Sequence, residues 1–328
     1  MMIEVRRTPI RPPAAEDFPA APPALPCAVQ ALAGELLTGS RPTMEGFDMR
    51  LRAGCEMTVT AAADCPAIAM LRPRSGLAQW LVSESYEFDP WVPTTEYVDV
   101  YGNLCQRLVI PQGSMRIRVE AVVETEGSIA VHPYAGVTPV ADLPDSSLIY
   151  LLPSRYCPAD KMTWQAQQIV AGLPPGYAQV EAIRAWIHQH IAYRYGVSDA
   201  STDALDTLDA GAGVCRDYAH VGMALCRSLN IPARMVVGYL YRLDPMDMHA
   251  WFEAFLDGRW YTFDATQDQP RGGRLVMAYG RDAADVALIS NYGPLETPSM
   301  TAWVEPVEGF GIAADTGAAP AGAAPTGG

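Results

Sequence analysis

A strict alternation of apolar and polar side chains over residues 49–61 limits the fold of this chain more than any other feature of its sequence. Every odd position in this segment is apolar, and every even position except Gly54 carries a polar or charged side chain. Successive side chains of a β-strand point to opposite faces of the sheet. The period of two therefore predicts a strand with one buried and one solvent-facing side.

A second alternating segment, residues 115–123, predicts a partner strand of the same kind. In the intervening segment 97–110, Gly102-Asn103 is a two-residue turn typical of β-hairpins. We therefore expect an antiparallel β domain over residues 47–135.

The composition of the remaining segments suggests how the rest of the chain is divided. Residues 1–46 contain seven prolines between positions 8 and 26, which predicts a flexible arm or, as the alternative, a ligand for a proline-binding domain. Residues 136–160, with four prolines, are expected to be a linker. Residues 301–328 end in a run of small residues and are expected to be a flexible tail. A second domain, which we expect to be catalytic, then covers residues 161–300.

The second domain is predicted to combine helices with antiparallel strands. Apolar residues recur at steps of three and four from Val180 to Ile191, which indicates a helix with one buried face. Asp257-Gly258 is among the strongest short hairpin signals. The predicted elements are helices over about 177–193 and 215–229, a strand over 234–241, and a hairpin of 249–256 with 259–265. This order predicts an α+β fold, a core preceded by an antiparallel β domain.

Cys215 directly follows a glycine-containing loop and begins one of the predicted helices. The unpaired N–H groups and the macrodipole at a helix N-terminus favour the thiolate, which is the nucleophilic form of cysteine. The same N–H groups can donate to the oxyanion that develops when a thiolate attacks a carbonyl. Asp217 suits the start of a helix, but a carboxylate close to the sulfur would oppose thiolate formation.

The predicted hairpin places a histidine and a carboxylate within reach of each other. With a two-residue turn between the strands, His249 and Asp264 become diagonal neighbours on one face of the sheet. The carboxylate can then fix the tautomer of the imidazole and stabilise its protonated form. A single cysteine or histidine is usually structural, but Cys215, His249 and Asp264 together predict a Cys-His-Asp catalytic site.

The segments around these three residues resemble the transglutaminase-like superfamily, which shares its fold with papain-type cysteine peptidases. The resemblance covers about residues 160–270 and rests on GVCRDYAHVGMALCRSLNIPARMVVGY, MHAWFEAFLDGRW and YTFDAT. The catalytic cysteine, histidine and aspartate of the family fall on Cys215, His249 and Asp264. The segment Ala69–Pro111 also looks like the N-terminal region of bacterial transglutaminase-like proteins.

The resemblance implies a papain-like core, no metal and no organic cofactor. It also implies an acyl-enzyme mechanism, in which Cys215 attacks an amide carbonyl and His249 protonates the departing amine. The second oxyanion donor in the family is an aromatic or amide side chain upstream of the cysteine. Trp186 and Tyr193 are the candidates for this role, although either could equally pack on a helix face.

Three functions are compatible with these residues. We expect a hydrolase that acts on peptide or isopeptide bonds. The first alternative is a true transglutaminase, in which an amine rather than water resolves the thioester. The second alternative is a non-catalytic binding module that keeps the fold. The natural substrate and the oligomeric state do not follow from the sequence.

Charge and cysteine content bear on the partners and on the compartment. With 37 acidic and 23 basic residues the net charge is −14, which opposes binding to nucleic acid. No apolar run is long enough to span a membrane, and the first residues lack the apolar stretch of a secretory signal. Seven scattered cysteines, an odd number, are typical of reduced thiols. We therefore expect a cytoplasmic enzyme whose partner is a peptide or protein substrate.

Overall fold

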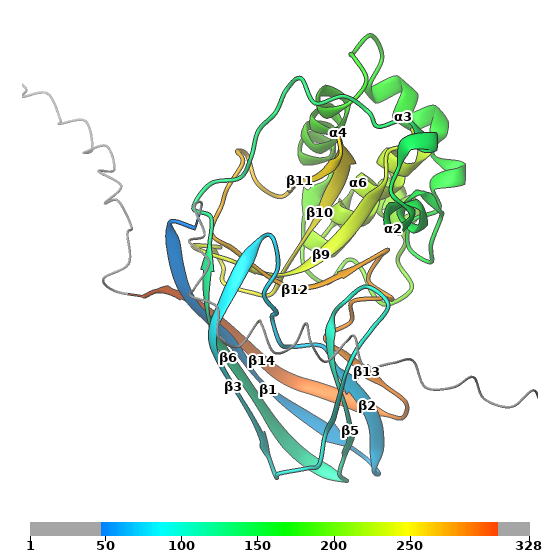
Figure 1. Cartoon of the computed structure of the whole chain (residues 1–328). Coiled ribbons are helices and arrows are strands. Elements are labelled where there is room, and N and C mark those ends of the chain that lie inside the picture. Colours follow the sequence, from blue (N-terminus) through cyan, green and yellow to red (C-terminus); the bar gives the residue numbers. More distant parts are fainter. Residues whose placement is uncertain (1–46, 308–328) are drawn as a thin grey trace, which may run out of the picture. The chain divides into compact units, whose positions relative to one another are not determined.

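The computed structural model of the chain describes residues 47–307 (Figure 1). The expected arm, residues 1–46, and residues 308–328 of the expected tail lie outside the described residues. Within the described part, antiparallel sheets combine with helices, so the predicted α+β fold is confirmed. No helix between residues 47 and 307 is long and apolar enough to cross a membrane.

The alternating segment forms a long strand inside a four-stranded antiparallel sheet. This strand, β1 (Met49–Ala61), lies between β6 (Gly113–Thr125) and β14 (Leu295–Pro306), and β3 (Gln79–Asp89) pairs with the other edge of β6. β1 and β6 keep one register along the whole of β1. The odd-numbered residues of β1 from Leu51 onward are all buried, as the alternation predicts.

A second antiparallel sheet contains the predicted hairpin around Gly102. Its strand order is β13 (Ile289–Asn291), β2 (Cys65–Ala69), β5 (Leu104–Ile110) and β4 (Thr95–Val98). The predicted two-residue turn is wrong, because β4 ends at Val98 and the loop covers residues 99–103. The Asp99 carboxylate accepts the backbone N–H groups of Tyr101 and Asn103, each at 2.8 Å, and this holds the longer loop.

Residues 289–306 belong to the β domain and not to the catalytic domain and tail to which the sequence assigned them. β13 pairs with β2, and β14 pairs with β1. The tail prediction is therefore wrong for residues 301–306, where Val304 is buried in the same apolar core as β1. The physical reason is that β1 has two edges with free backbone groups, and β6 satisfies only one of them.

Residues 136–160 are more than the expected linker, because they form short helices that pack on the core. These helices are η1 (Val140–Asp142), α2 (Asp145–Leu148), η2 (Ile149–Leu151) and η3 (Ala159–Lys161). Tyr150, Tyr156 and Cys157 are buried. Three of the four prolines, Pro139, Pro144 and Pro158, stand directly before one of these helical turns.

A third four-stranded sheet, the core sheet, is covered by helices (Figure 1). Its order is β11 (Arg259–Phe263), β10 (His249–Leu256), β9 (Ala233–Leu240) and β12 (Arg274–Gly280), and all neighbours are antiparallel. The helices of this region are α3 (Thr163–Ile169), α4 (Tyr177–His190), α5 (Ala204–Ala210) and α6 (Cys215–Ser228). The predicted stripe of α4 is confirmed, because Val180, Ile183 and Ile187 are fully buried.

α6 lies directly against β10, and small side chains make this close approach possible. A Cβ atom at Gly222 would come within 2.9 Å of three ring atoms of Phe252. Every residue of α6 from Asp217 to Arg227 is buried. The packing therefore fixes the start of α6 relative to the start of β10.

The β10–β11 hairpin has the register that the sequence predicts. Leu256 pairs with Arg259, and Phe252 pairs with Phe263 on the face that packs into the core. Asp257 and Gly258 both have positive φ, 47° and 78°, as a type I′ turn requires. The register therefore carries His249 and Asp264 to adjacent positions at the open end of the hairpin.

The β domain holds β12 in place through buried hydrogen bonds. The Gln79 side chain donates to the backbone O of Val276 and accepts from its N–H, both at 2.7 Å. The Thr125 hydroxyl donates to the backbone O of Arg274 at 2.9 Å. These bonds fix the strand that begins with Arg274.

Candidate active site

Cys215 is the first residue of α6, and Asp217 fixes the turn that presents it. The Asp217 carboxylate accepts the Val214 N–H at 2.9 Å, which caps the helix start. Asp217 is fully buried, and the Arg216 guanidinium donates to its Oδ1 at 2.9 and 3.0 Å. The charge of this carboxylate is therefore offset by Arg216, and Cys215 itself is only half-buried.

His249 and Asp264 meet at the open end of the hairpin. His249 begins β10, Asp264 follows β11, and the distance from His249 Nε2 to Asp264 Oδ2 is 2.7 Å. Because an ionised carboxylate only accepts hydrogen bonds, Nε2 carries the proton of this bond. Nδ1 is then the ring nitrogen left for a reacting group.

Cys215 and His249 line the same pocket, which has a volume of about 400 Å³. Burial by itself would lower the pKa of His249, but the charge and hydrogen bond of Asp264, followed by the Cys215 side chain, raise it to about 9. Burial would raise the pKa of Asp264, but the positive charges of His249 and Arg274 hold it well below its usual range. The imidazole is therefore protonated and the carboxylate ionised at neutral pH.

Arg274 is a site residue that the sequence analysis missed. Its Nη2 donates to Asp264 Oδ2 at 2.9 Å, the same oxygen that His249 contacts, and its guanidinium lies over the ring of Trp251. The other oxygen, Oδ1, accepts the N–H and the hydroxyl of Thr266 at 3.0 and 2.7 Å. No local spacing links Arg274 to Asp264, because their contact depends on the pairing of β12 with β9.

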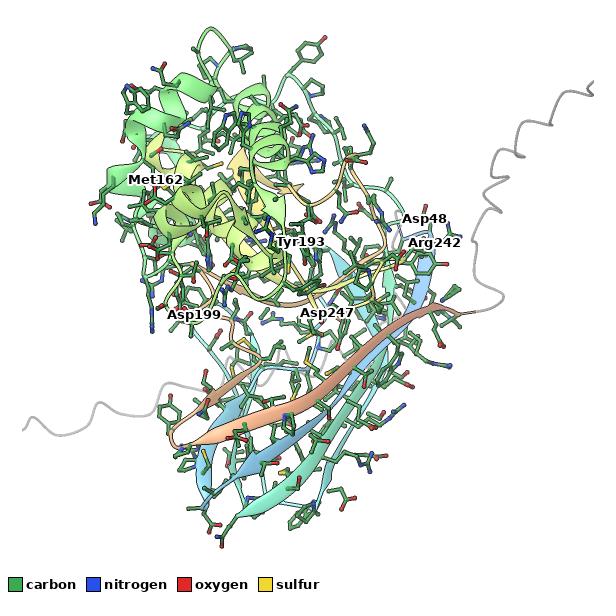
Figure 2. The ribbon with its side chains drawn as sticks, turned by 180° about the vertical axis from the view of Figure 1, so that it is seen from behind. Asp48, Met162, Tyr193, Asp199, Arg242 and Asp247 are labelled. Carbon is green, nitrogen blue, oxygen red and sulfur yellow. The ribbon has the colours of Figure 1, made fainter. Side chains whose placement is uncertain are left out.

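Of the two candidate oxyanion donors, Tyr193 is the one that contacts Cys215. β7 (Ala192–Tyr193) pairs in parallel with β8 (Ala212–Gly213), and this brings Tyr193, labelled in Figure 2, next to the loop before α6. Burial, the Cys215 charge and Tyr195 raise the pKa of the Tyr193 phenol, while the Cys215 backbone N–H acts in the opposite direction. Trp186 instead stacks on His190, with 4.4 Å between ring centroids.

The described residues hold no cluster of three or more His, Cys, Asp or Glu side chains arranged to bind a metal. His188 contacts the backbone O of Ala265 through Nδ1 at 2.9 Å and the Asp268 carboxylate through Nε2 at 2.7 Å. The role of this histidine is therefore to hold the loop that follows Asp264.

Comparison with known families and structures gives matches over both parts of the chain. The model of the transglutaminase-like superfamily matches residues 164–265. The model of the bacterial transglutaminase-like N-terminal region matches residues 60–126. The first match includes Cys215, His249 and Asp264.

Individual relatives extend these matches. A candidate cysteine protease from Cytophaga hutchinsonii has a crystal structure that is similar with a TM-score of 0.75 and 32% identity, over 79% of this chain and 91% of that one. An uncharacterized protein of Mycobacterium leprae is 29% identical over 67% of this chain and 83% of its own length. An uncharacterized protein of Mycobacterium tuberculosis is 29% identical over 66% of this chain and 77% of its own length.

Proposed function

Because this chain belongs to the transglutaminase-like superfamily, we propose that it hydrolyses peptide or isopeptide bonds through a thioester formed on Cys215. The observation that carries this proposal is the buried His249–Asp264 pair, 2.7 Å apart, which shares a pocket with the half-buried Cys215. A nucleophile, a proton carrier and a carboxylate that orients the carrier are the groups that acyl transfer requires.

In the first proposed step the Cys215 thiolate attacks the amide carbonyl and forms a C–S bond. The Cys215 N–H at the start of α6 and the Tyr193 hydroxyl stabilise the oxyanion. With a pKa of about 9, His249 is protonated at neutral pH. It gives a proton to the amide nitrogen as the C–N bond breaks, and the amine leaves.

In the second proposed step water attacks the thioester. His249, now neutral, takes a proton from the water, the C–S bond breaks, and the carboxylic acid and the free cysteine are released. Asp264 and Arg274 keep their charges throughout, so the imidazole returns to the same orientation after each cycle.

Hydrolysis is favoured over transfer to an amine by the exposure of the site. Cys215 is half-buried and Tyr193 is 45% exposed, so water reaches the position where the thioester would form. Efficient transfer to an amine requires that water be kept away from the thioester. True transglutaminase activity remains the second candidate function.

The nucleophile is tested by alkylation with iodoacetamide in a Cys27→Ser background, because Cys27 lies outside the described residues. The other cysteines of the described part are buried, so labelling should fall on Cys215. We expect His249→Ala to slow this labelling at pH 7 by about tenfold or more, and Asp264→Asn to slow it less, because orientation is lost while the proton acceptor remains. Labelling that does not depend on His249 would favour the non-catalytic binding module.

The reaction type is tested with a glutamine-containing peptide, alone and with a labelled primary amine. Hydrolysis releases ammonia or a free acid and amine without incorporation of the label, whereas transfer attaches the label to the peptide. The matched control is Cys215→Ala, which should keep the fold and lose all turnover. Full turnover in Cys215→Ala would contradict the proposed mechanism.

A further inference from the structure

An apolar wall forms most of the pocket that contains Cys215 and His249. Nine of the thirteen lining residues are apolar, and six of these, on β9, beside His249 and in the segment after β12, form the wall. They are Met235, Val237, Met248, Ala250, Val286 and Leu288. Five of them are at least nine-tenths buried, so the wall belongs to the packed core and is preformed.

The charged side chains of the pocket are already bound by the protein itself. Arg216 lines the pocket, but its guanidinium donates to Asp217 and, through Nη2, to the backbone O of Asp199 at 2.9 Å. Asp199 is labelled in Figure 2. No aspartate or glutamate of the described residues lines this pocket. A charged substrate side chain would lose its water here without gaining a partner.

We propose that this pocket is a specificity site, which binds an aliphatic or aromatic side chain on the acyl side of the scissile amide. The inference rests on the proposed function. The acyl group stays bonded to the Cys215 sulfur until hydrolysis, whereas the amine departs with a proton from His249. A side chain held in a wall that adjoins Cys215 therefore orients the carbonyl in both steps of the reaction.

The size of the preference follows from burial of the side chain. Small differences in apolar contact change kcat/KM by about 10- to 200-fold. A leucine or phenylalanine side chain should therefore react about 10- to 100-fold faster than alanine at the same position. Aspartate or lysine should react no faster than alanine, because its charge has no partner in the pocket.

The test uses peptidyl chloromethyl ketones, which carry only the acyl side of a substrate. The thiolate displaces chloride, so that a C–S bond forms, the C–Cl bond breaks and chloride leaves. Two series, acetyl-Ala-X-Gly-CH₂Cl and acetyl-Ala-Gly-X-CH₂Cl, with X as Ala, Leu, Phe, Asp or Lys, vary the two positions nearest the carbonyl. The rate of labelling of Cys215 is measured in the Cys27→Ser protein by mass spectrometry.

Two variants connect the preference to the pocket. Val286→Phe fills the pocket and should lower the rate of labelling by the preferred Leu or Phe probe, relative to the rate with the small probe iodoacetamide, at least tenfold. The matched control is Val304→Phe, which changes a similarly buried valine of β14 outside this pocket. If Val286→Phe does not fold, Val286→Ala replaces it and should shift the preference toward Phe, because it widens the pocket.

The outcomes separate this inference from the proposed function. Equal labelling rates for all X in both series, or faster labelling by Asp or Lys, overturn the specificity site but leave Cys215 as a nucleophile. A preference that Val286→Phe or Val286→Ala leaves unchanged also overturns it. Failure of iodoacetamide and of every chloromethyl ketone to label Cys215 contradicts the proposed function itself.

Discussion

The raised pKa of His249 predicts that this residue makes folding stability depend on pH. The pKa of His249 is about 9 in the folded protein, against about 6.5 in an unfolded chain. The folded state therefore binds one proton more than the unfolded state between these two values. Stability from His249 is fully present below pH 6.5 and is lost as the pH rises through 9.

The size of this pH effect on stability follows from the pKa shift of His249. One pKa unit corresponds to about 1.36 kcal/mol, so the free energy of unfolding should fall by about 3 kcal/mol between pH 6.5 and 9. Cys215 would confuse the measurement, because its side chain also contributes to the pKa of His249. The experiment is therefore made in a Cys215→Ala background. The figure is then an upper limit, because Asp264 supplies the larger favourable part of the shift and Cys215 the smaller part.

The assay is urea unfolding at pH 6, 7, 8 and 9 of Cys215→Ala and of Cys215→Ala/His249→Gln. Other titrating groups occur in both proteins, so their contributions cancel in the difference. Arg274 still pairs with Asp264 in the second protein, so the carboxylate keeps a partner. The stability advantage of the first protein should shrink steadily with pH. A difference that stays constant within about 0.5 kcal/mol would refute the assigned charge state of His249.

Three other changes test particular contacts. Arg274→Met removes a charge-assisted hydrogen bond to Asp264, so the free energy of unfolding measured in urea should fall by about 1.5–3 kcal/mol. Acid unfolding of this variant should also start at higher pH, and Arg274→Lys should show smaller effects of both kinds. Tyr193→Phe removes one oxyanion donor and should lower kcat by about 10²–10³-fold in the peptide assay, with thermal stability nearly unchanged. Gly238→Ala places a Cβ atom 1.8 Å from the Leu275 backbone O, so it should lower the free energy of unfolding in urea by about 3 kcal/mol or more. The control is Gly76→Ala, whose Cβ atom meets no atom within 4 Å. Wild-type behaviour of any of these three would contradict the contact assigned to that residue.

The relation between His249 and Asp264 was predictable from the sequence because a short hairpin is a local structure. The Asp257-Gly258 turn fixes the register, and the register fixes which residues meet at the open end of the hairpin. The start of α6 at Cys215 was also predictable from a local signal, the glycine-containing loop that directly precedes it. The likeness of these segments to a known family supplied only the expected role of each residue.

The boundaries of the β domain were not predictable in this way. β14 is recognisable only through its partner β1, which lies more than two hundred residues earlier in the chain. Most of its side chains are exposed and only Val304 is buried, so the strand shows no strong alternation. The Asp99 side chain likewise replaced a two-residue turn with a longer loop.

The sequence by itself determined the strands with one buried face, the hairpin register and the identity of Cys215, His249 and Asp264 as candidate reactive residues. These features depend on side-chain period and turn chemistry within short segments. Only the tertiary structure decided that Arg274 supports Asp264, that Tyr193 rather than Trp186 contacts Cys215, and that an apolar pocket adjoins the sulfur. Each of these contacts depends on how the strands and helices pack around the core sheet, and that packing sets the distances between the side chains.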